Sequence, residues 1–309
     1  MADKIATRAS YGQALVELGA ENENIVVLDA DLSGSTMTKK FAEKYPERFF
    51  NAGIAEENMV GMAAGLALSG KTVFCSSFAM FASGRAFEVI RNSVAHNSAN
   101  VKICATHAGV TVGPDGASHQ CLEDLAIMRV IPRMTVINPA DDVSARKLIK
   151  QAAAMDGPCY IRLGRSAVPV VYGEDADIQI GKALEVKSGS DFTVIATGIM
   201  VDKAVQAAEI LEAKGVHVRV LDMHTIKPID KDAIVRAAAE TGGIVTAEEH
   251  NIIGGLGSAV AEVLASTVPC RMAMVGVQDR FGQSAEPDEL LARYGLLAED
   301  IVKAVESLK

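Results

Sequence analysis

The sequence lacks several features that would place it in a specialised class of protein. It has no tryptophan, only 5 cysteines among 309 residues, and a formal net charge of −9 at pH 7. The acidic balance argues against a general nucleic-acid binder and against binding to an anionic membrane surface. The cysteines are odd in number and widely spaced. This pattern argues against a disulfide framework or a metal cage and is typical of reduced thiols in a cytoplasmic protein.

Long apolar runs are also missing. No stretch reaches the roughly 18 apolar residues that a membrane span requires. The first residues, MADKIATRAS, contain no apolar segment of the kind found in signal peptides. What is present is 49% hydrophobic residues, 22% charged residues and 26 glycines. This composition is typical of a globular α/β enzyme with many tight turns between strands and helices.

Short β-branched runs alternate with longer helical patterns along the chain, which predicts parallel strands joined by crossover helices. Periodicity weakens after the first group of these units, where proline and glycine mark a linker. We therefore predict an α/β fold of two doubly wound domains, residues 1–168 and 186–309, joined by a linker at 169–185. Within the first domain we expect a helix at 81–94 and a loop at 107–120.

The most unusual stretch is NAGIAEENMVGMAAG, residues 51–65. Two adjacent acids, Glu56 and Glu57, stand at the beginning of a helix that is apolar on nearly every side from 59 to 68. Acids favour the positive end of a helix, so simple decoration of the helix end is one interpretation. A helix that is apolar all round is expected to be buried, and a buried carboxylate is suited to act as an acid or a base.

Two aromatic residues and a long loop are further candidates. Phe78 and Phe81 follow a strand, where they either pack in the core or form a flat shelf for a heteroaromatic ring. The loop contains His107, Asp115 and His119 among glycines. Long ordered loops are usually functional, and the spacing here does not suit a metal site, which favours acid–base or phosphate-binding roles.

Basic and glycine-rich positions give weaker signals. Arg8, Arg162 and Arg165 stand near predicted element ends, where each alone is an ordinary surface charge but together they could hold a phosphate. The GGLG at residues 254–257 follows a strand and precedes a helix. Its spacing is incomplete for a dinucleotide-binding loop, so it carries little weight.

Several stretches in order resemble the C-terminal half of the thiamine-diphosphate enzymes of the transketolase family. They are DADLSGS, GIAEEN, SSFAMF, THAGVTVGPDGASHQ, MRVIPRM and IRLGRS. The series covers about 160 residues, and the second domain is similar to the C-terminal domain of the family. The resemblance therefore implies a pyrimidine-binding domain with a parallel sheet, followed by a transketolase-type C-terminal α/β domain.

The resemblance also implies thiamine diphosphate as cofactor. Glu56 matches the glutamate that bonds the pyrimidine ring of the cofactor and activates it, whereas Glu57 matches no functional position. Phe81 matches the aromatic residue that stacks on this ring, with Phe78 beside it. Asp31 matches an acid in the cofactor neighbourhood.

The substrate positions are implied in the same way. The residues that match ligands of a sugar-phosphate tail are Arg8, Ser35, His107 and Arg165. Asp115 and His119 match positions that contact substrate hydroxyls and aid proton movement, so His119 is expected to join Glu56 in catalysis. The implied activity is transfer of a two-carbon ketol unit from a ketose phosphate to an aldose phosphate.

One family motif is missing. The family binds the diphosphate and its divalent metal through a GDG…N motif, which does not occur in this sequence. The resemblance therefore implies an N-terminal partner subunit that carries the motif and holds Mg²⁺ or Ca²⁺, with no metal bound by this chain. Because the beginning of the chain resembles a natural N-terminus, we expect an α2β2 assembly, and a chain that is inert alone.

Three other interpretations stay open. MHTIKPID at 223–230 and EEHNIIGGLGS at 248–258 are similar to 1-deoxyxylulose-5-phosphate synthase or to 2-oxoacid dehydrogenase β-subunits. THAG in place of the DRAG of the synthase argues against the first, and the GPDGASHQ loop with Arg165 argues against the second. The third is a non-catalytic subunit that only binds a partner, which would have no need of Glu56, Phe81 and His119 together.

Overall fold

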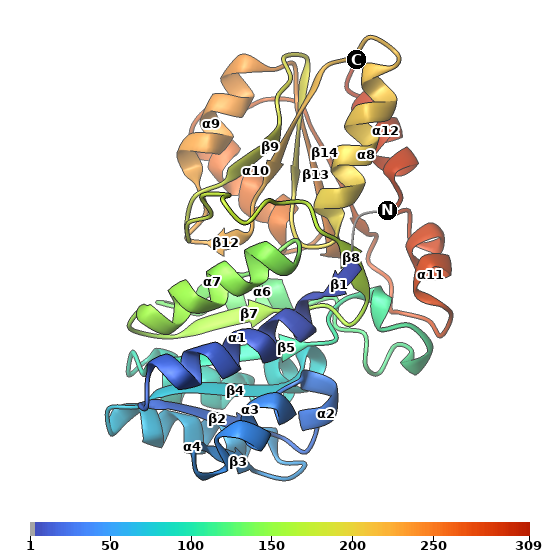
Figure 1. Cartoon of the computed structure of the whole chain (residues 1–309). Coiled ribbons are helices and arrows are strands. Elements are labelled where there is room, and N and C mark those ends of the chain that lie inside the picture. Colours follow the sequence, from blue (N-terminus) through green and yellow to red (C-terminus); the bar gives the residue numbers. More distant parts are fainter. Residues whose placement is uncertain (1–3) are drawn as a thin grey trace.

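The computed structural model describes residues 4–309. Two sheets, each flanked by helices, lie one above the other, with the N-terminal half of the chain below and the C-terminal half above (Figure 1). No helix within residues 4–309 has the length and apolar character needed to cross a bilayer.

The lower sheet has seven strands in the order β12-β6-β7-β5-β4-β2-β3, all parallel except β12. Its strands are β2 (Ile25–Asp29), β3 (Phe49–Asn51), β4 (Thr72–Phe78), β5 (Val101–Thr106), β6 (Thr135–Ile137), β7 (Cys159–Arg162) and β12 (Thr225–Lys227). The central strands β2, β4, β5 and β7 are buried along almost their whole length, because both faces of a parallel sheet are covered by helices.

Helices cover both faces of this sheet. α1 (Thr7–Glu21) and α7 (Asp142–Ala154) pack together on one face, while α4 (Glu56–Leu68) and α6 (Asp124–Arg129) lie on the other. The strand residues alternate between the two layers, so Val27 packs in the cluster that contains α1 and Leu28 in the cluster that contains α4. The shorter elements here are α2 (Ser33–Thr36), α3 (Lys39–Lys44), α5 (Phe87–Val89) and 3₁₀ turns at Pro46–Arg48 and Val110–Asp115.

The upper sheet has five strands in the order β14-β13-β10-β11-β9, with β9 antiparallel at its edge. The strands are β9 (Leu184–Lys187), β10 (Phe192–Ala196), β11 (Val218–Asp222), β13 (Ile244–Asn251) and β14 (Met272–Val277). α8 (Met200–Glu212) and α12 (Ala298–Glu306) cover one face, and α9 (Lys231–Glu240) and α10 (Leu256–Ser266) cover the other; α11 (Pro287–Arg293) lies against the 3₁₀ turn at Val110–Asp115. The predicted pair of doubly wound α/β units is confirmed.

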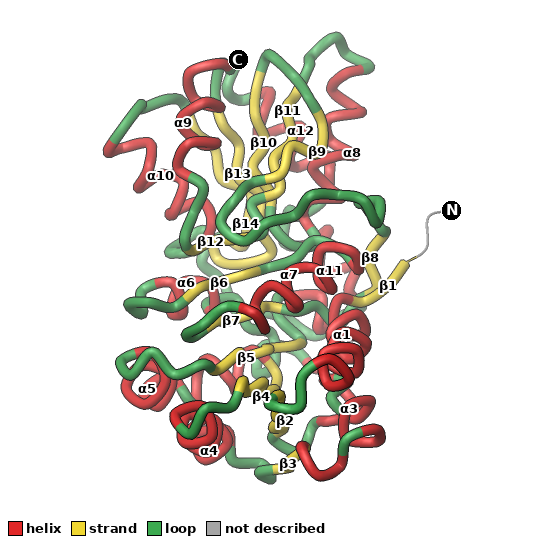
Figure 2. The backbone as a smooth tube through the Cα atoms, turned by 60° about the vertical axis from the view of Figure 1, so that its left-hand side comes forward, coloured by secondary structure: helices red, strands yellow, loops and turns green. Residues whose placement is uncertain are grey.

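The two halves are connected by more than the linker. β12, which follows β11 of the upper sheet, crosses to pair with β6 at the edge of the lower sheet (Figure 2). At the other end of the junction, β1 (Lys4–Ala6) pairs with β8 (Ala167–Pro169). β1, β8 and β12 each have only three residues, and a run this short has no clear periodicity. The sequence therefore could not show which strand each of them pairs with.

Residues 81–94 are helical as predicted, except at Ala86, but they do not form one regular α-helix. The chain forms two π-helical segments, Met80–Arg85 and Ile90–Ala95, on either side of α5. In the first segment, Ser83 Oγ donates a hydrogen bond of 2.6 Å to the carbonyl of Ala79, a side-chain bond that competes with the regular backbone ladder. π-Helical turns are frequent at functional sites, and this one carries Phe81 and Arg85.

Candidate functional site

The buried carboxylate of Glu56 is the centre of the candidate site. Glu56 is the first residue of α4 and only 3% exposed. Its oxygens accept hydrogen bonds from Ser77 Oγ at 3.1 Å and from Arg85 Nη1 at 3.2 Å. Sequence reasoning found Glu56 but missed Ser77 and Arg85, because nothing in the spacing shows that β4 and the π-helical segment bring them to α4.

The expectation that α4 is buried all round is wrong. One face packs on the sheet through residues such as Met59, Ala63 and Ala67, but Met62 and Leu68 on the other face are exposed. Ile54, just before the helix, is 77% exposed. Exposed large apolar side chains near a candidate site are candidates for a surface that another protein covers.

Two aromatic rings continue the site from Glu56. The centroids of Phe78 and Phe81 lie 6.0 Å apart with the rings tilted by 21°, and the Arg85 guanidinium lies over the Phe81 ring at 4.4 Å. Phe78 also stacks on the imidazole of His107, with centroids 3.9 Å apart. The rings of His119 and Phe81 form a T-shaped pair with centroids 5.2 Å apart. Glu56, both aromatic residues and both histidines predicted from the sequence are therefore neighbours.

His107 stands just after β5 in a left-handed backbone conformation, with φ +57°. Burial lowers its pKa to about 3, with further lowering by the positive charges of Arg8 and Arg165 and by His119. The imidazole is therefore neutral near pH 7. Arg8 Nη1 lies 3.5 Å from the Nε2 atom of the ring, and Thr106 Oγ1 lies 2.9 Å from Nδ1. Each ring nitrogen therefore has a polar neighbour whichever of the two carries the proton.

Glu56, Phe81, Phe78 and His107 form a row of side chains, and two arginines border its His107 end. Arg8 Nη1 donates to the carbonyl of Ser35 at 2.8 Å, and Arg165 Nη1 donates to the carbonyl of Val112 at 2.6 Å and to Asp115 Oδ2 at 3.2 Å. Burial lowers the pKa of Arg8, and the charge of Arg165 lowers it further. Within residues 4–309, the buried Nε of Arg8 has no hydrogen-bond partner. Two neighbouring cations with spare donors suit an anionic ligand.

Asp31 lies at the opposite end of the row, where it accepts a hydrogen bond of 2.9 Å from Asn51 Nδ2. It borders a cavity next to Glu56 that is lined by Ala30, Asp31, Leu32, Ile54, Glu56, Phe81 and Arg85. The neighbouring Asp29 is buried and accepts from the amide of Leu32 and the hydroxyls of Thr36 and Thr38, which holds this loop in shape. Asp29 is a supporting residue that sequence reasoning missed.

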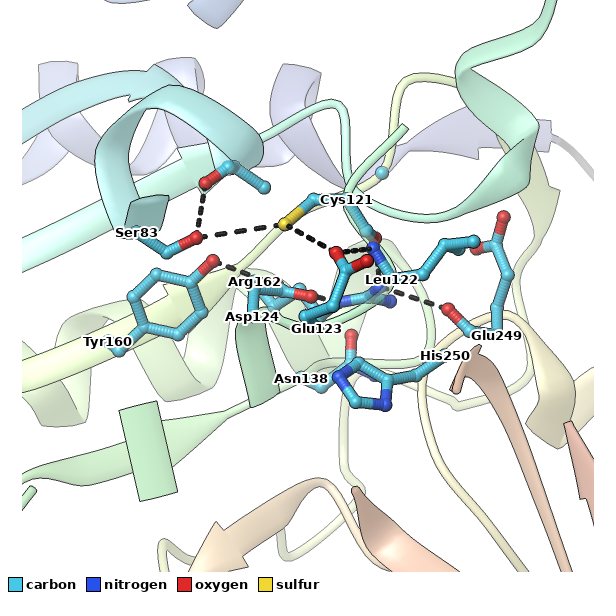
Figure 3. Close-up of polar contacts among 12 residues, drawn as sticks. Ser83, Cys121, Leu122, Glu123, Asp124, Asn138, Tyr160, Arg162, Glu249 and His250 are labelled. Atoms are coloured by element: carbon cyan, nitrogen blue, oxygen red, sulfur yellow. Dashed lines mark hydrogen bonds and ion pairs between the residues drawn. The ribbon is translucent and has the colours of Figure 1, made fainter. Parts of the chain in front are cut away.

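Arg162 does not belong with the other arginines, so this expectation is wrong. Its side chain is buried, and its Nε forms an ion pair of 2.9 Å with Asp124, which also accepts from the Tyr160 hydroxyl (Figure 3). Its Nη2 donates to the carbonyl of Glu249 in the upper half at 2.9 Å. Arg162 therefore ties the two halves together instead of facing a ligand.

The glycine-rich turn at residues 254–257 is also internally satisfied. The buried carboxylate of Glu248 accepts from the amides of Leu256 and Gly257 at 2.7 Å and 2.8 Å, at the beginning of α10. A Cβ added at Gly255 would lie 2.0 Å from this carboxylate. The helix N-terminus that a dinucleotide phosphate would need is therefore occupied by the protein itself.

The site residues come from the carboxyl ends of neighbouring strands: Asp31 after β2, Phe78 from β4, His107 after β5 and Arg165 after β7. A doubly wound sheet binds ligands at this edge. The structure thus defines an α/β protein of the class that places its active site at the ends of parallel strands.

Comparison with known proteins identifies the family. Residues 3–171 match the model described as transketolase, pyrimidine binding domain, and residues 181–301 match transketolase, C-terminal domain. The chain belongs to the transketolase family, as its C-terminal section.

The similar proteins include chains of similar length and chains about twice as long. A Methanocaldococcus jannaschii protein, provisionally named a transketolase C-terminal section, is 53% identical over 301 residues, which are 96% of this chain and 94% of that protein. One of the subunits of apulose-4-phosphate transketolase from Phocaeicola vulgatus is 41% identical, with 99% of this chain and 98% of that protein covered. Human transketolase is 40% identical over 99% of this chain but only 49% of its own length.

Solved structures agree with this assignment. A structure described as a split gene transketolase, inactive beta4 tetramer, superposes with a TM-score of 0.91 at 55% identity, covering 99% of this chain and 98% of that one. Transketolase of Campylobacter jejuni gives a TM-score of 0.85 at 24% identity, with 99% of this chain and 47% of that chain covered, which shows a shared fold.

Proposed function

We propose that this chain is the C-terminal subunit of a split transketolase that moves a two-carbon ketol unit from a ketose phosphate to an aldose phosphate. The observation that supports this proposal is a series of neighbouring side chains. Arg85 connects Glu56 to Phe81, the rings of Phe81, Phe78 and His107 follow, and Arg8 and Arg165 lie at the far end. The series combines a buried proton-handling group, a flat apolar wall and an anion-binding end. The reaction would place the chain in the pentose phosphate pathway, in the cytoplasm.

The residues at the Glu56 end fit the aminopyrimidine of thiamine diphosphate, the cofactor on which the family depends. Glu56 offers a buried carboxylate beside a cavity, and Phe81 offers a half-buried ring face on the same wall. When bound, the cofactor supplies the nucleophilic carbon that carries the ketol unit. In this proposal Glu56 holds the proton at the pyrimidine nitrogen, Phe81 and Phe78 orient the ring, and Asp31 borders it.

The other end of the row suits the sugar phosphate. Arg8, Ser35, His107 and Arg165 are proposed ligands of the phosphate tail, because two cations and a neutral imidazole converge there. Since its pKa is lowered, His107 donates or accepts hydrogen bonds without charge. Asp115 and the partly exposed His119 are proposed to contact substrate hydroxyls, and His119 to move protons.

An N-terminal partner subunit is proposed to complete the site. The GDG…N motif that would hold the diphosphate and Mg²⁺ is absent from the sequence. The exposed side chain of Ile54 lines the Glu56 cavity, and Met62 and Leu68 are exposed further along α4, which supports a protein cover over this end. The related structure described as an inactive beta4 tetramer further supports a need for a second kind of subunit, in an α2β2 enzyme.

Relatives of this chain are named for different sugars, so the donor has to be determined separately. The related SqwH subunit from Clostridium sp. is named for 6-deoxy-6-sulfo-D-fructose, and the Phocaeicola vulgatus protein for apulose 4-phosphate. Two guanidinium groups can donate hydrogen bonds to either a phosphate or a sulfonate. The transketolase names of these relatives support ketol transfer over the synthase and dehydrogenase alternatives, and the retained site argues against a purely structural subunit.

The test is a panel of donors offered to the reconstituted enzyme. The chain is mixed with a GDG…N-bearing subunit from the same genome, thiamine diphosphate and Mg²⁺, with ribose 5-phosphate as acceptor. Sedoheptulose 7-phosphate from xylulose 5-phosphate supports the proposal, and selective use of the sulfo-sugar or of apulose 4-phosphate would reassign the donor. Absence of ketol transfer from every donor, with a partner that binds the chain, would overturn it.

A further inference from the structure

One carboxylate of the upper half reaches into the loop that carries the candidate substrate residues. Glu249, on β13, accepts a hydrogen bond of 2.6 Å from the backbone amide of Thr111, and both residues are buried. The carboxylate also lies directly against Gly109, where an added Cβ would come within 2.2 Å of it. The positive φ of +81° and this close approach explain why glycine occupies position 109.

The same short stretch is held on its other side by the substrate arginine. Ser166 Oγ donates to the carbonyl of Thr111 at 3.1 Å, and Arg165 Nη1 donates to the carbonyl of Val112 at 2.6 Å. Residues 109–112 therefore lie between a carboxylate of the upper sheet and the segment that follows β7. His107 stands two residues before this stretch, and Asp115 three residues after it.

We propose that Glu249 is a positioning residue, through which the C-terminal domain fixes residues 109–112 and thereby aligns His107, Asp115 and Arg165 for the sugar phosphate. The part that concerns the substrate rests on the proposed function; the anchoring of the loop does not. The C-terminal domain then contributes to substrate binding without touching the substrate.

The groups around Glu249 are consistent with an anchoring carboxylate. Arg162 attracts it from β7 and donates to its backbone carbonyl, while Asp124 on α6 repels it (Figure 3). Burial is the largest influence and raises its pKa to about 7. Loss of the proton strengthens the carboxylate as an acceptor for the Thr111 amide.

The test compares three variants. E249A removes the acceptor, whereas E249Q keeps an oxygen of similar reach. E248Q changes the adjacent buried carboxylate, which accepts from the first amides of α10, and so controls for general loosening of the upper half. Amide hydrogen exchange at residues 109–112 is measured on the isolated chain, and kcat and KM on the enzyme reconstituted with its partner subunit.

In E249A we expect protection of the Thr111 amide to fall by about tenfold or more, and KM for the sugar phosphate to rise by a similar factor with a smaller change in kcat. E249Q should recover most of both, and E248Q should leave both near wild type. Wild-type protection in E249A, no recovery in E249Q, or equal effects of E249A and E248Q would overturn the proposal. If the wild-type chain shows no ketol transfer with any partner, the proposed function fails, while the exchange data still decide whether Glu249 anchors the loop.

Discussion

Replacing Glu56 by glutamine separates the chemistry of the carboxylate from its part in the fold. The two oxygens of Glu56 accept hydrogen bonds from Ser77 Oγ and Arg85 Nη1. A glutamine has the same size, can accept from Arg85 through its oxygen, and can donate its amide to Ser77 Oγ. We therefore expect the E56Q variant to keep the native arrangement of α4, β4 and the π-helical segment.

The free energy of unfolding should change little in E56Q. The Arg85 side chain is 53% exposed, so its ion pair with Glu56 contributes about 1 kcal/mol or less. In the opposite direction, the variant no longer buries a charge, and desolvating a carboxylate costs several kcal/mol. Because the two effects oppose each other, we expect stability within about 1 kcal/mol of wild type, or above it.

The effect on turnover should be far larger. Loss of a positioned acid–base group lowers kcat by about 10²–10⁴-fold, or about 3–5 kcal/mol in activation free energy. The assay is ketol transfer by the reconstituted enzyme at saturating cofactor and partner subunit, with stability measured by urea unfolding of the chain alone. E57Q is the matched control, since Glu57 lies in the same helical turn but is exposed. A near-normal kcat in E56Q, or equal losses in E56Q and E57Q, would refute the role of Glu56.

Three further variants test the pH dependence, the loop and the assembly surface. The pKa of His107 lies near 3 in the native state and near 6.5 when unfolded, so its contribution to stability is present above pH 6.5 and lost as the pH falls toward 3. H107N should therefore reduce the acid dependence of the unfolding free energy by up to about 1.4 kcal/mol per pH unit, as measured by urea unfolding between pH 7 and 5. G109A should lower stability by about 1–3 kcal/mol, because of its positive φ and the Glu249 carboxylate, whereas G65A on the open face of α4 should be neutral or stabilising in thermal melts. I54E should weaken association with the partner subunit in sedimentation velocity, while V268E, on an exposed turn after α10, should not; unchanged association in I54E would contradict the assembly surface.

Regular elements with a strong pattern could be predicted from the sequence. The alternation of short β-branched runs with longer helical patterns predicted the two doubly wound α/β units, and both sheets have the expected mainly parallel strands. The contacts of short segments could not be predicted. β12 has three residues, and its place beside β6 depends on how the whole upper half folds back.

The candidate site was predicted as a set of residues but not as a network. Ordered motifs pointed to Glu56, Phe81, His107 and Arg165, and the fold brings them to one edge of the lower sheet. The hydrogen-bond partners that hold the site together were not predictable: Arg85 reaches Glu56 across 29 residues, and Glu249 reaches Thr111 across 138. The same ambiguity made Arg162 look like a ligand, since a sequence does not show that Asp124 neutralises it.

The exposed face of α4 illustrates a different limit. Apolar residues all round a helix indicate burial, but they do not say whether the cover comes from the same chain. Met62 and Leu68 are uncovered in this chain, while Met59 and Ala63 are buried. A pattern that predicts burial, in a helix whose outer residues this chain leaves exposed, supports the proposed partner subunit.

Titration of this chain into a fixed amount of its N-terminal partner tests the central claim most directly. Formation of sedoheptulose 7-phosphate from xylulose 5-phosphate and ribose 5-phosphate is followed with thiamine diphosphate and Mg²⁺ in excess. We predict no turnover from either chain alone, and a rate that rises with added chain and saturates at one copy per partner. Turnover by this chain alone, or none at any ratio with a partner that binds it, would contradict the account.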